Sequence, residues 1–282
     1  MVGVLGVSAS AILVRFSQAP SGVTAAYRLG WTVLLLLPVV LLRCRAELRR
    51  VTARDLVLCG ASGVLLALHF LTWFESLKRT SVASSTVLVS TEVIFTALGF
   101  ALFLHGKIPR LGVWAILLAF GGSALLALSG GGGAGELSGN LLALAAASAA
   151  AVYTLIGRIQ RGHLSTTVYT FLTYLACFLT LLLGTAAAGT PLTGYGGREG
   201  LIGLALAVLC TLLGHSLFSW CLKYLSPSYV SAAKLCEPVF SSLAAIPLFG
   251  EVPGPLQLAG GAAVLGAVLL YTWAEREKTP AG

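Results

Sequence analysis

Charged residues are scarce in this chain of 282 residues. Only 10% are Asp, Glu, Lys or Arg, against roughly 25% in ordinary soluble domains, whereas 57% are hydrophobic. So little charge cannot coat a soluble protein of this length. The apolar residues fall into runs of about 17 to 25, the length that crosses a hydrocarbon core of roughly 30 Å. We therefore expect lipid to be the solvent of this protein.

Several motifs that mark other functions are missing. No phosphate-binding loop, nucleotide fold or nucleophile–base arrangement is present, and no loop is long enough to hold a soluble ATPase domain. The cysteines form no Cys-x-x-Cys pair and no His-rich metal spacing, so we interpret them as small buried hydrophobic residues. They are Cys44, Cys59, Cys177, Cys210, Cys221 and Cys236. The sequence thus predicts no metal, no cofactor and no enzymatic activity, and it argues against ATP-driven transport by this chain alone.

Turns and charges predict ten transmembrane helices. The expected ranges are residues 2–17, 23–42, 56–77, 80–104, 111–129, 138–160, 166–188, 201–223, 227–249 and 255–273. The first range follows Met1 directly, without a basic leader segment or a cleavage site, so we interpret it as a helix and not as a signal peptide. Several connections are very short, which makes neighbouring helices antiparallel.

The distribution of Lys and Arg predicts the orientation of these spans. The net charge is +8, but the basic residues crowd into short loops, which is typical of membrane orientation and not of nucleic-acid binding. Twelve of the 18 basic residues lie in loops on one side, three in loops on the other, and three inside or near the ends of spans. We expect a multi-pass protein of the cytoplasmic membrane with both termini in the cytoplasm.

The second half of the sequence repeats the first at an offset of 145 residues. The offset aligns Lys78 with Lys223, Glu92 with Glu237 and Phe95 with Phe240 without a gap. Since each copy holds five spans, an odd number, the copies face opposite ways across the membrane, as in many secondary transporters. The predicted fold is all-α and integral to the membrane, with two inverted-topology five-helix repeats around a central cavity. The expected parts are a first repeat at 1–129, a Gly-rich connection at 130–137, a second repeat at 138–273 and a cytoplasmic tail at 274–282.

Segments from nearly the whole chain carry a family resemblance. They are SAILVRFS (10–17), AAYR (25–28), LTWFESLKRTSVASSTVLVSTEVIF (71–95), LGFALFLHGKI (98–108) and WCLKYLSPSYVSAAKLCEPVFSSLAAIPLFGEV (220–252). A tryptophan, Leu-Lys, a small-residue helix, Glu-Pro and a final Phe-Gly-Glu are typical of the second repeat of EamA-type permeases. The chain therefore resembles the drug/metabolite transporter superfamily, although its first repeat departs from the pattern at Val93 and at His105-Gly106-Lys107.

The resemblance implies a basket of ten helices around a cavity formed mainly by the first, third, fourth, sixth, eighth and ninth. It also implies relatives that mostly export amino acids and other small metabolites. The substrate does not follow from it. No ATPase subunit is implied, and a monomer would suffice, because the two repeats already supply what a dimer of five-helix units would.

Ionisable groups inside spans are candidates for the substrate cavity, because each costs at least about 2.5 to 3.5 kcal/mol on insertion scales. Lys234 and Glu237 share a helical face, and Pro238 favours a kink, so this unit either lines or gates the cavity or forms a structural pair. Glu92, the counterpart of Glu237, lies in a run of small polar residues that can also hold helices together. The run is Ser84, Ser85, Thr86, Ser90 and Thr91.

Other candidates have equally plain structural alternatives. His69 and His215 lie at nearly equivalent positions of the two repeats, and each either packs or faces the cavity, where it can take a proton. Trp73 and Trp220 either stack on a substrate or act as interfacial or packing residues. We interpret Tyr153 as a cavity residue. Arg15 and Arg28 lie near span ends, where snorkelling to the interface competes with recognition of a substrate carboxylate.

Small-residue seams at Gly121-Gly122 and at Gly260-Gly261 with Gly266 are expected to let helices pack closely. The leading hypothesis is a secondary transporter that works by alternating access and exports or exchanges a small organic metabolite such as an amino acid. A multidrug exporter of hydrophobic compounds would share the fold but have a wider and less charged cavity. An intramembrane enzyme acting on lipid would need its acid and base at one membrane face, whereas these groups spread through both repeats.

Overall fold

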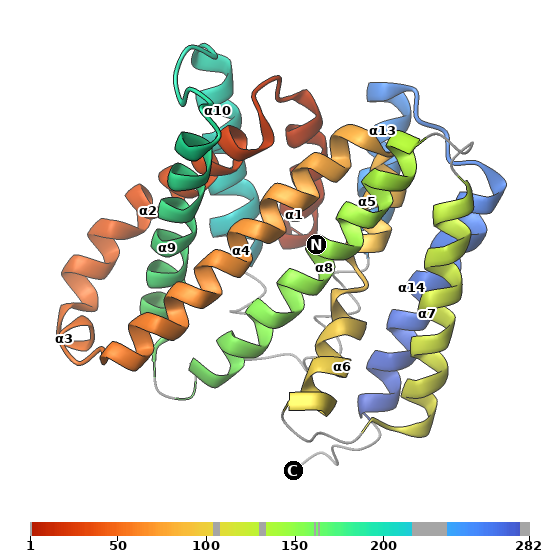
Figure 1. Ribbon diagram of the computed structural model, residues 1–282, viewed down its shortest axis with the longest axis horizontal. Coiled ribbons are helices and arrows are strands. Elements are labelled where there is room, and N and C mark those ends of the chain that lie inside the picture. Colours follow the sequence, from red (N-terminus) through yellow and green to blue (C-terminus); the bar gives the residue numbers. More distant parts are fainter. Residues whose placement is uncertain are drawn as a thin grey trace.

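The computed structural model describes residues 2–103, 108–129, 134–160, 162, 164–215 and 236–276, and every regular element within these ranges is helical. Figure 1 shows the helices as one bundle. They are α1 (Val2–Phe16), α2 (Ser21–Arg43), α3 (Arg45–Leu48), α4 (Ala53–Arg79), α5 (Val82–Val89), α6 (Glu92–Phe103), α7 (Arg110–Ser129), α8 (Ala134–Gln160), α9 (Thr166–Ala187), α10 (Gly197–Ala205), the π-helical segment η1 (Leu206–His215), α13 (Cys236–Phe249) and α14 (Pro255–Arg276).

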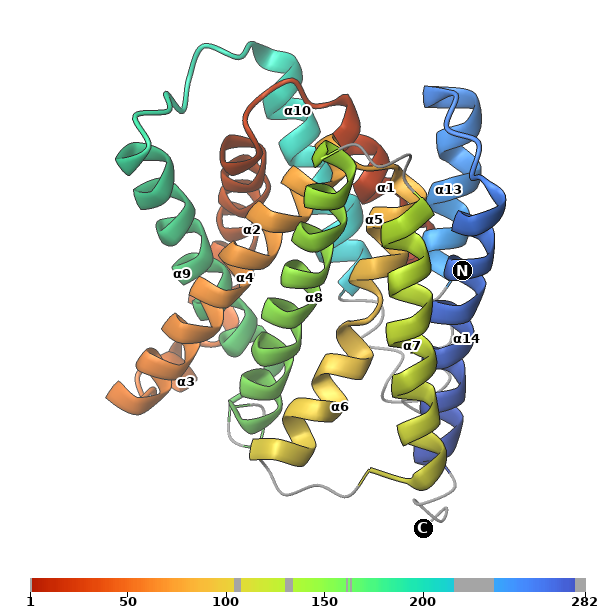
Figure 2. The ribbon, with the colours of Figure 1, turned by 45° about the vertical axis from the view of Figure 1, so that its right-hand side comes forward.

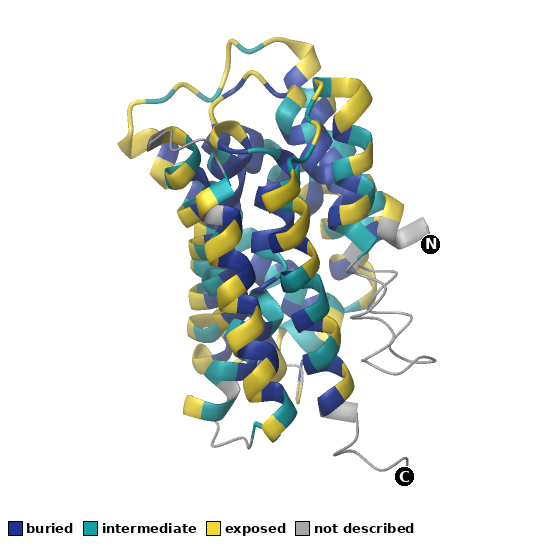
Figure 3. Ribbon diagram, turned by 90° about the vertical axis from the view of Figure 1, so that its right-hand side faces the viewer, coloured by how far each residue is buried: buried dark blue, intermediate teal, exposed yellow. Residues whose placement is uncertain are grey.

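Most of these helices have the length and composition of membrane spans. Within the described residues, seven helical segments are long and apolar enough to cross a bilayer, and three further apolar helices are shorter. Exposed residues lie on the outside of the bundle (Figure 3), and many of them are large and apolar, such as Leu42 at 84% and Leu128 at 77% exposure. An apolar outer surface of this extent fits a multi-pass membrane protein. The inverted orientation of the two halves, the domain boundaries and the side on which the termini lie stay predictions.

Two of the expected spans are not continuous α-helices. The range 80–104 divides into α5 and α6 at Ser90-Thr91. The hydroxyl of Ser90 donates to the carbonyl of Thr86 (2.9 Å), and that of Thr91 donates to the carbonyl of Leu88 (2.6 Å). Such side-chain bonds compete with the helical ladder. In the expected range 201–223, the chain changes from α10 to the wider η1, and residues after 215 are not described until 236.

The two longest helices, α4 and α8, pack against each other at the centre of the bundle (Figure 1). α4 packs against α8 and α9, α2 packs against α9, and α1 packs against η1 and α13. α7 and α14 lie side by side at one edge (Figures 1 and 2). The seam expected there is confirmed at one pair, because a Cβ atom at Gly122 would meet the carbonyl oxygen of Gly260 at 2.9 Å. Gly121 and Gly266 face open space instead.

Polar side chains define where several helices begin. α4 starts with a capping box, in which the Thr52 hydroxyl accepts from the Asp55 N–H and the Asp55 carboxylate accepts from the Thr52 N–H. Ser81 caps α5, and Ser165 caps α9. These caps satisfy backbone donors that a helix start leaves unpaired. They fix the starts of α4, α5 and α9.

Candidate functional site

Arg28 is the most deeply buried cation among the described side chains. It lies eight residues into α2 with 2% of its surface exposed. Its Nε donates to the Thr211 hydroxyl of η1 (3.0 Å), and its Nη1 donates to the Ser10 hydroxyl of α1 (3.1 Å). Its guanidinium carbon stands 4.4 Å from the centre of the Phe70 ring of α4. Four helical segments therefore meet at this one charge.

The partners of Arg28 are neutral hydroxyls and an aromatic face. Within the described ranges no carboxylate forms an ion pair with it, although Glu237 lies close enough to interact electrostatically. A buried cation is normally paired, because removing it from water costs several kcal/mol. The environment of Arg28 therefore favours an anion. Of the two alternatives for Arg28, snorkelling to the interface does not fit, since its side chain is almost fully buried inside the bundle.

Aromatic rings on α4 extend this site. The rings of His69 and Phe70 lie 5.1 Å apart, and those of His69 and Trp73 are stacked at 5.8 Å and 25°. His69 Nδ1 is 3.0 Å from the carbonyl oxygen of Ala146 on α8, so it carries the hydrogen and donates. Trp73 is 5% exposed, and its indole N–H has no acceptor among the described residues. The expected role of Trp73 as an interfacial anchor does not fit this interior position.

We call this set the interior cluster: Ser10, Arg28, His69, Phe70, Trp73 and Thr211. Two further candidates lie at its border. Tyr153, on α8, is partly buried and packs against the same core. Glu92 stands directly after the break between α5 and α6, accepts from the Thr154 hydroxyl (2.8 Å) and interacts electrostatically with His69. The cluster therefore presents buried donors, with carboxylates at its edge.

A second polar site lies at the end of the bundle where α1 and α4 end and α5 begins. The Arg15 guanidinium forms an ion pair with the Glu251 carboxylate in the loop between α13 and α14. It also donates to the carbonyls of Leu77 and Thr80 at the end of α4. Glu251 accepts from the backbone N–H of Val82 at the start of α5 (2.7 Å). One ion pair thus connects four segments of the chain.

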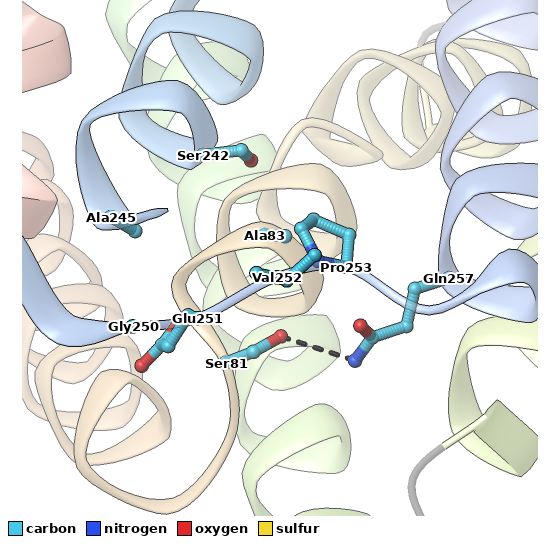
Figure 4. A pocket seen from close by; sticks show the side chains of 9 residues that line it. All are labelled: Ser81, Ala83, Ser242, Ala245, Gly250, Glu251, Val252, Pro253 and Gln257. Carbon is cyan, nitrogen blue, oxygen red and sulfur yellow. Dashed lines mark hydrogen bonds between the residues drawn. The ribbon is translucent and has the colours of Figure 1, made fainter. Parts of the chain in front are cut away.

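A cavity of about 280 Å³ adjoins this ion pair and is named here the end cavity. Figure 4 shows Gln257 of α14 directed toward Ser81, to which its amide donates at 3.3 Å. The same amide donates to the Ser84 hydroxyl at 3.3 Å. The end cavity is lined by Ser81, Ala83, Ser242, Ala245, Gly250, Glu251, Val252, Pro253 and Gln257.

Part of the predicted site falls outside what the structure describes. Trp220 and Lys234 lie outside the described residues, as does the side chain of His215. Glu237 is half-buried in the first turn of α13. Pro238 lies one residue further on, and because the residues before 236 are not described, a kink there stays a prediction.

Sequence reasoning missed four side chains that matter for these sites. Ser10, Phe70 and Thr211 are ordinary helix residues, and nothing in their spacing marks them as partners of Arg28. Glu251 belongs to the Phe-Gly-Glu segment that carried the resemblance, so that motif was the available signal. Arg15 lies near a span end, as expected, but with 24% exposure of its side chain it pairs with Glu251.

The sequence profile of the EamA-like transporter family matches residues 1–128 and 137–273. The chain is similar to a protein of Streptantibioticus cattleyicolor named "Probable terminal-alkyne amino-acid exporter", with 28% identity over 79% of this chain and 75% of that protein. It is also similar to an uncharacterized protein of Pseudomonas aeruginosa, with 34% identity over 63% of this chain and 62% of that protein. A solved crystal structure, described only as that of a protein, matches with a TM-score of 0.62 at 18% identity, over 96% of this chain and 94% of that chain. This last likeness concerns the fold alone.

Proposed function

Because the chain belongs to the EamA-like transporter family, we propose that it is a secondary transporter that exports or exchanges an amino acid or a related small metabolite. In this proposal it works by alternating access in the cytoplasmic membrane, driven by a gradient of substrate, proton or another ion. The observation that carries the substrate class is Arg28, a buried guanidinium whose described partners are all neutral.

A substrate carboxylate completes the surroundings of Arg28. The planar guanidinium offers a fork of donors that matches the two oxygens of a carboxylate. Trp73 adds a buried N–H that lacks an acceptor in the described part of the chain. Glu237 and Glu92, at the border of the interior cluster, are suited to an ammonium group. A zwitterion therefore matches the charges of the site better than an uncharged hydrophobic compound does.

Three further observations support the proposal. The family profile matches two stretches of similar length, which fits two repeats of one unit, and such repeats provide the two similar states that alternating access needs. One of the related proteins is named as an amino-acid exporter. The break before Glu92 also fits, because discontinuous helices line substrate sites in many transporters.

The test is counterflow in proteoliposomes loaded with a pool of amino acids, with exchange read by mass spectrometry. Each amino acid is paired with its amide and its decarboxylated amine. We expect selective exchange of one class of amino acids and weak exchange of the matching amides and amines. Equal exchange of all three forms would contradict carboxylate recognition. No exchange of amino acids, together with exchange of hydrophobic drugs, would instead identify a multidrug exporter.

A further inference from the structure

We propose that the ion pair between Arg15 and Glu251 is a lock that keeps this end of the bundle closed and breaks each time the transporter opens there. The proposal rests on the alternating access proposed above, and it places this end at the outer face, as the Lys and Arg distribution predicts. It names a conformational role for two residues whose side chains lie outside the interior cluster.

The position of the pair suits a lock. Arg15 is the penultimate residue of α1, and Glu251 lies in the loop between α13 and α14, 236 residues further along the chain. The first residue belongs to one matched stretch of the family profile and the second to the other. A movement that opens this end by separating the two halves would therefore break the pair.

The surroundings of the pair let it open at small cost. Arg15 also donates to two carbonyls at the end of α4, and Glu251 also accepts from an N–H at the start of α5. Helix ends leave such groups without helical partners, and their dipoles favour these charges. When the halves separate, Arg15 keeps the two carbonyls at the end of α4, which belong to its own half. Glu251 loses the N–H of Val82 together with Arg15, and its carboxylate is left facing the end cavity, where water can solvate it. Both charges therefore have partners in the open arrangement, as a switch between two states requires.

Water can reach the pair from the side of the end cavity. The side chains of Arg15 and Glu251 are 24% and 19% exposed, and Glu251 also lines the cavity. Ion pairs with partial exposure are weaker than fully buried ones, because solvent screens them. A ring contact adds to closure, since the Phe249 ring lies 5.4 Å from the Arg15 guanidinium and 5.1 Å from the Phe16 ring.

Beneath the lock, the contact between α1 and α13 is closed to solvent. Ser241 of α13 is 0% exposed and donates to the Ser8 carbonyl of α1 at 3.0 Å. It lies ten residues before Glu251, roughly 15 Å along a helix. Ala245, between the two, lines the end cavity and is 1% exposed. A thiol at either position reports whether the outer end has opened.

The experiment measures how fast a membrane-impermeant maleimide, added outside intact cells, labels Ser241→Cys. The backgrounds are the native pair, Arg15→Glu, Glu251→Arg and the double exchange, with labelling read peptide by peptide. We expect each single reversal to speed labelling by at least about fivefold, the lower end of typical coupling between conformational states. The double exchange should return the rate part of the way toward native, because the exchanged charges attract each other but meet the α4 carbonyls and the Val82 N–H with the wrong sign. Ala245→Cys serves as a second reporter if the first fails to fold.

Two controls distinguish opening of the outer end from a general loss of folded structure. Arg79→Glu breaks an ion pair at the same end, but that pair joins residues of one helix, Glu75 and Arg79 at 2.8 Å, so it should leave labelling unchanged. Cys177 of α9 is fully buried and should stay unlabelled in every variant that remains folded.

Three results would overturn the lock: equal labelling with and without the single reversals, a double exchange as reactive as the singles, or a gain seen only from the cytoplasmic side. Labelling needs no substrate. A protein that fails the counterflow test but gains reactivity on reversal would keep the lock and lose the proposed substrate. The opposite result would keep the transporter and reject the lock.

Discussion

Gly122 of α7 and Gly260 of α14 approach so closely that a Cβ atom on either would lie 2.9 Å from the carbonyl oxygen of the other. The two backbones are thus in direct contact, with no side chain between them. Close backbone approach through small residues is a common source of helix association in membranes, where lipid removes the hydrophobic drive. The edge pair of helices is held together at this point.

Gly122→Ala should therefore destabilise the protein by about 1–3 kcal/mol, because the added methyl group forces the helices apart. The measurement is thermal unfolding in detergent, followed by loss of the monodisperse peak. Gly121→Ala is the matched control, since a Cβ atom there meets nothing within 4 Å. Equal melting temperatures for the two variants would contradict the contact.

Arg28→Gln should lower the transport efficiency, kcat/KM, of amino-acid counterflow roughly tenfold to hundredfold. This is the range expected for the loss of a hydrogen bond to a charged group. Arg28→Lys keeps the charge but lacks the planar fork of donors, so its transport efficiency should lie between those of Arg28→Gln and the native protein. Arg198→Gln is the control, because Arg198 is exposed and bonds only the Phe16 carbonyl in the described structure. A folded Arg28→Gln protein with native efficiency and native preference for carboxylates would refute the assignment.

Trp73→Phe should weaken substrate binding while leaving the stability of the folded protein nearly unchanged. The indole N–H has no acceptor within the described residues, and a phenyl ring can still stack on His69. We expect the free energy of unfolding to change by less than about 1.5 kcal/mol. The KM for counterflow should rise about threefold to tenfold if a substrate oxygen accepts this hydrogen. An unchanged KM in a folded variant would remove Trp73 from the binding site.

Glu237→Gln should insert and fold but transport poorly. The substitution keeps shape and removes a negative charge that lies within electrostatic range of Arg28. We expect counterflow to fall about tenfold, measured beside a quantification of inserted protein. Glu136→Gln, at the start of α8, is the control and should transport normally. Native flux through a stable Glu237→Gln protein would show that the site does not use this carboxylate.

The positions of most described helices follow directly from the sequence, because apolar runs and turn residues are local signals. The break at Ser90-Thr91 does not. Neither residue is Gly or Pro. The hydroxyl bonds found at the break can be made by any Ser or Thr in a membrane helix, so they do not mark this position in the sequence. The sequence does not predict the π-helical form of η1 either, because the pattern LAVLCTLLGH is that of an ordinary apolar helix.

The interior cluster was only partly predictable. The sequence marks Arg28, His69 and Trp73 because charged and amphipathic residues in spans are rare. It does not show that Arg28 meets Ser10, 18 residues earlier, and Thr211, 183 residues later. Those distances in sequence are bridged only by tertiary packing. The same holds for Glu251, whose loop position conceals its ion pair until α1 and α13 are placed together.

The 236 residues between Arg15 and Glu251 also set an order of events during biosynthesis. At a translation rate of roughly 5–20 residues per second, Arg15 emerges about 10 to 50 s before its partner exists. Among its described partners, the carbonyls at the end of α4 are synthesised first, since α4 ends at Arg79. The ion pair with Glu251 can form only once α13 and the loop that follows it have been made.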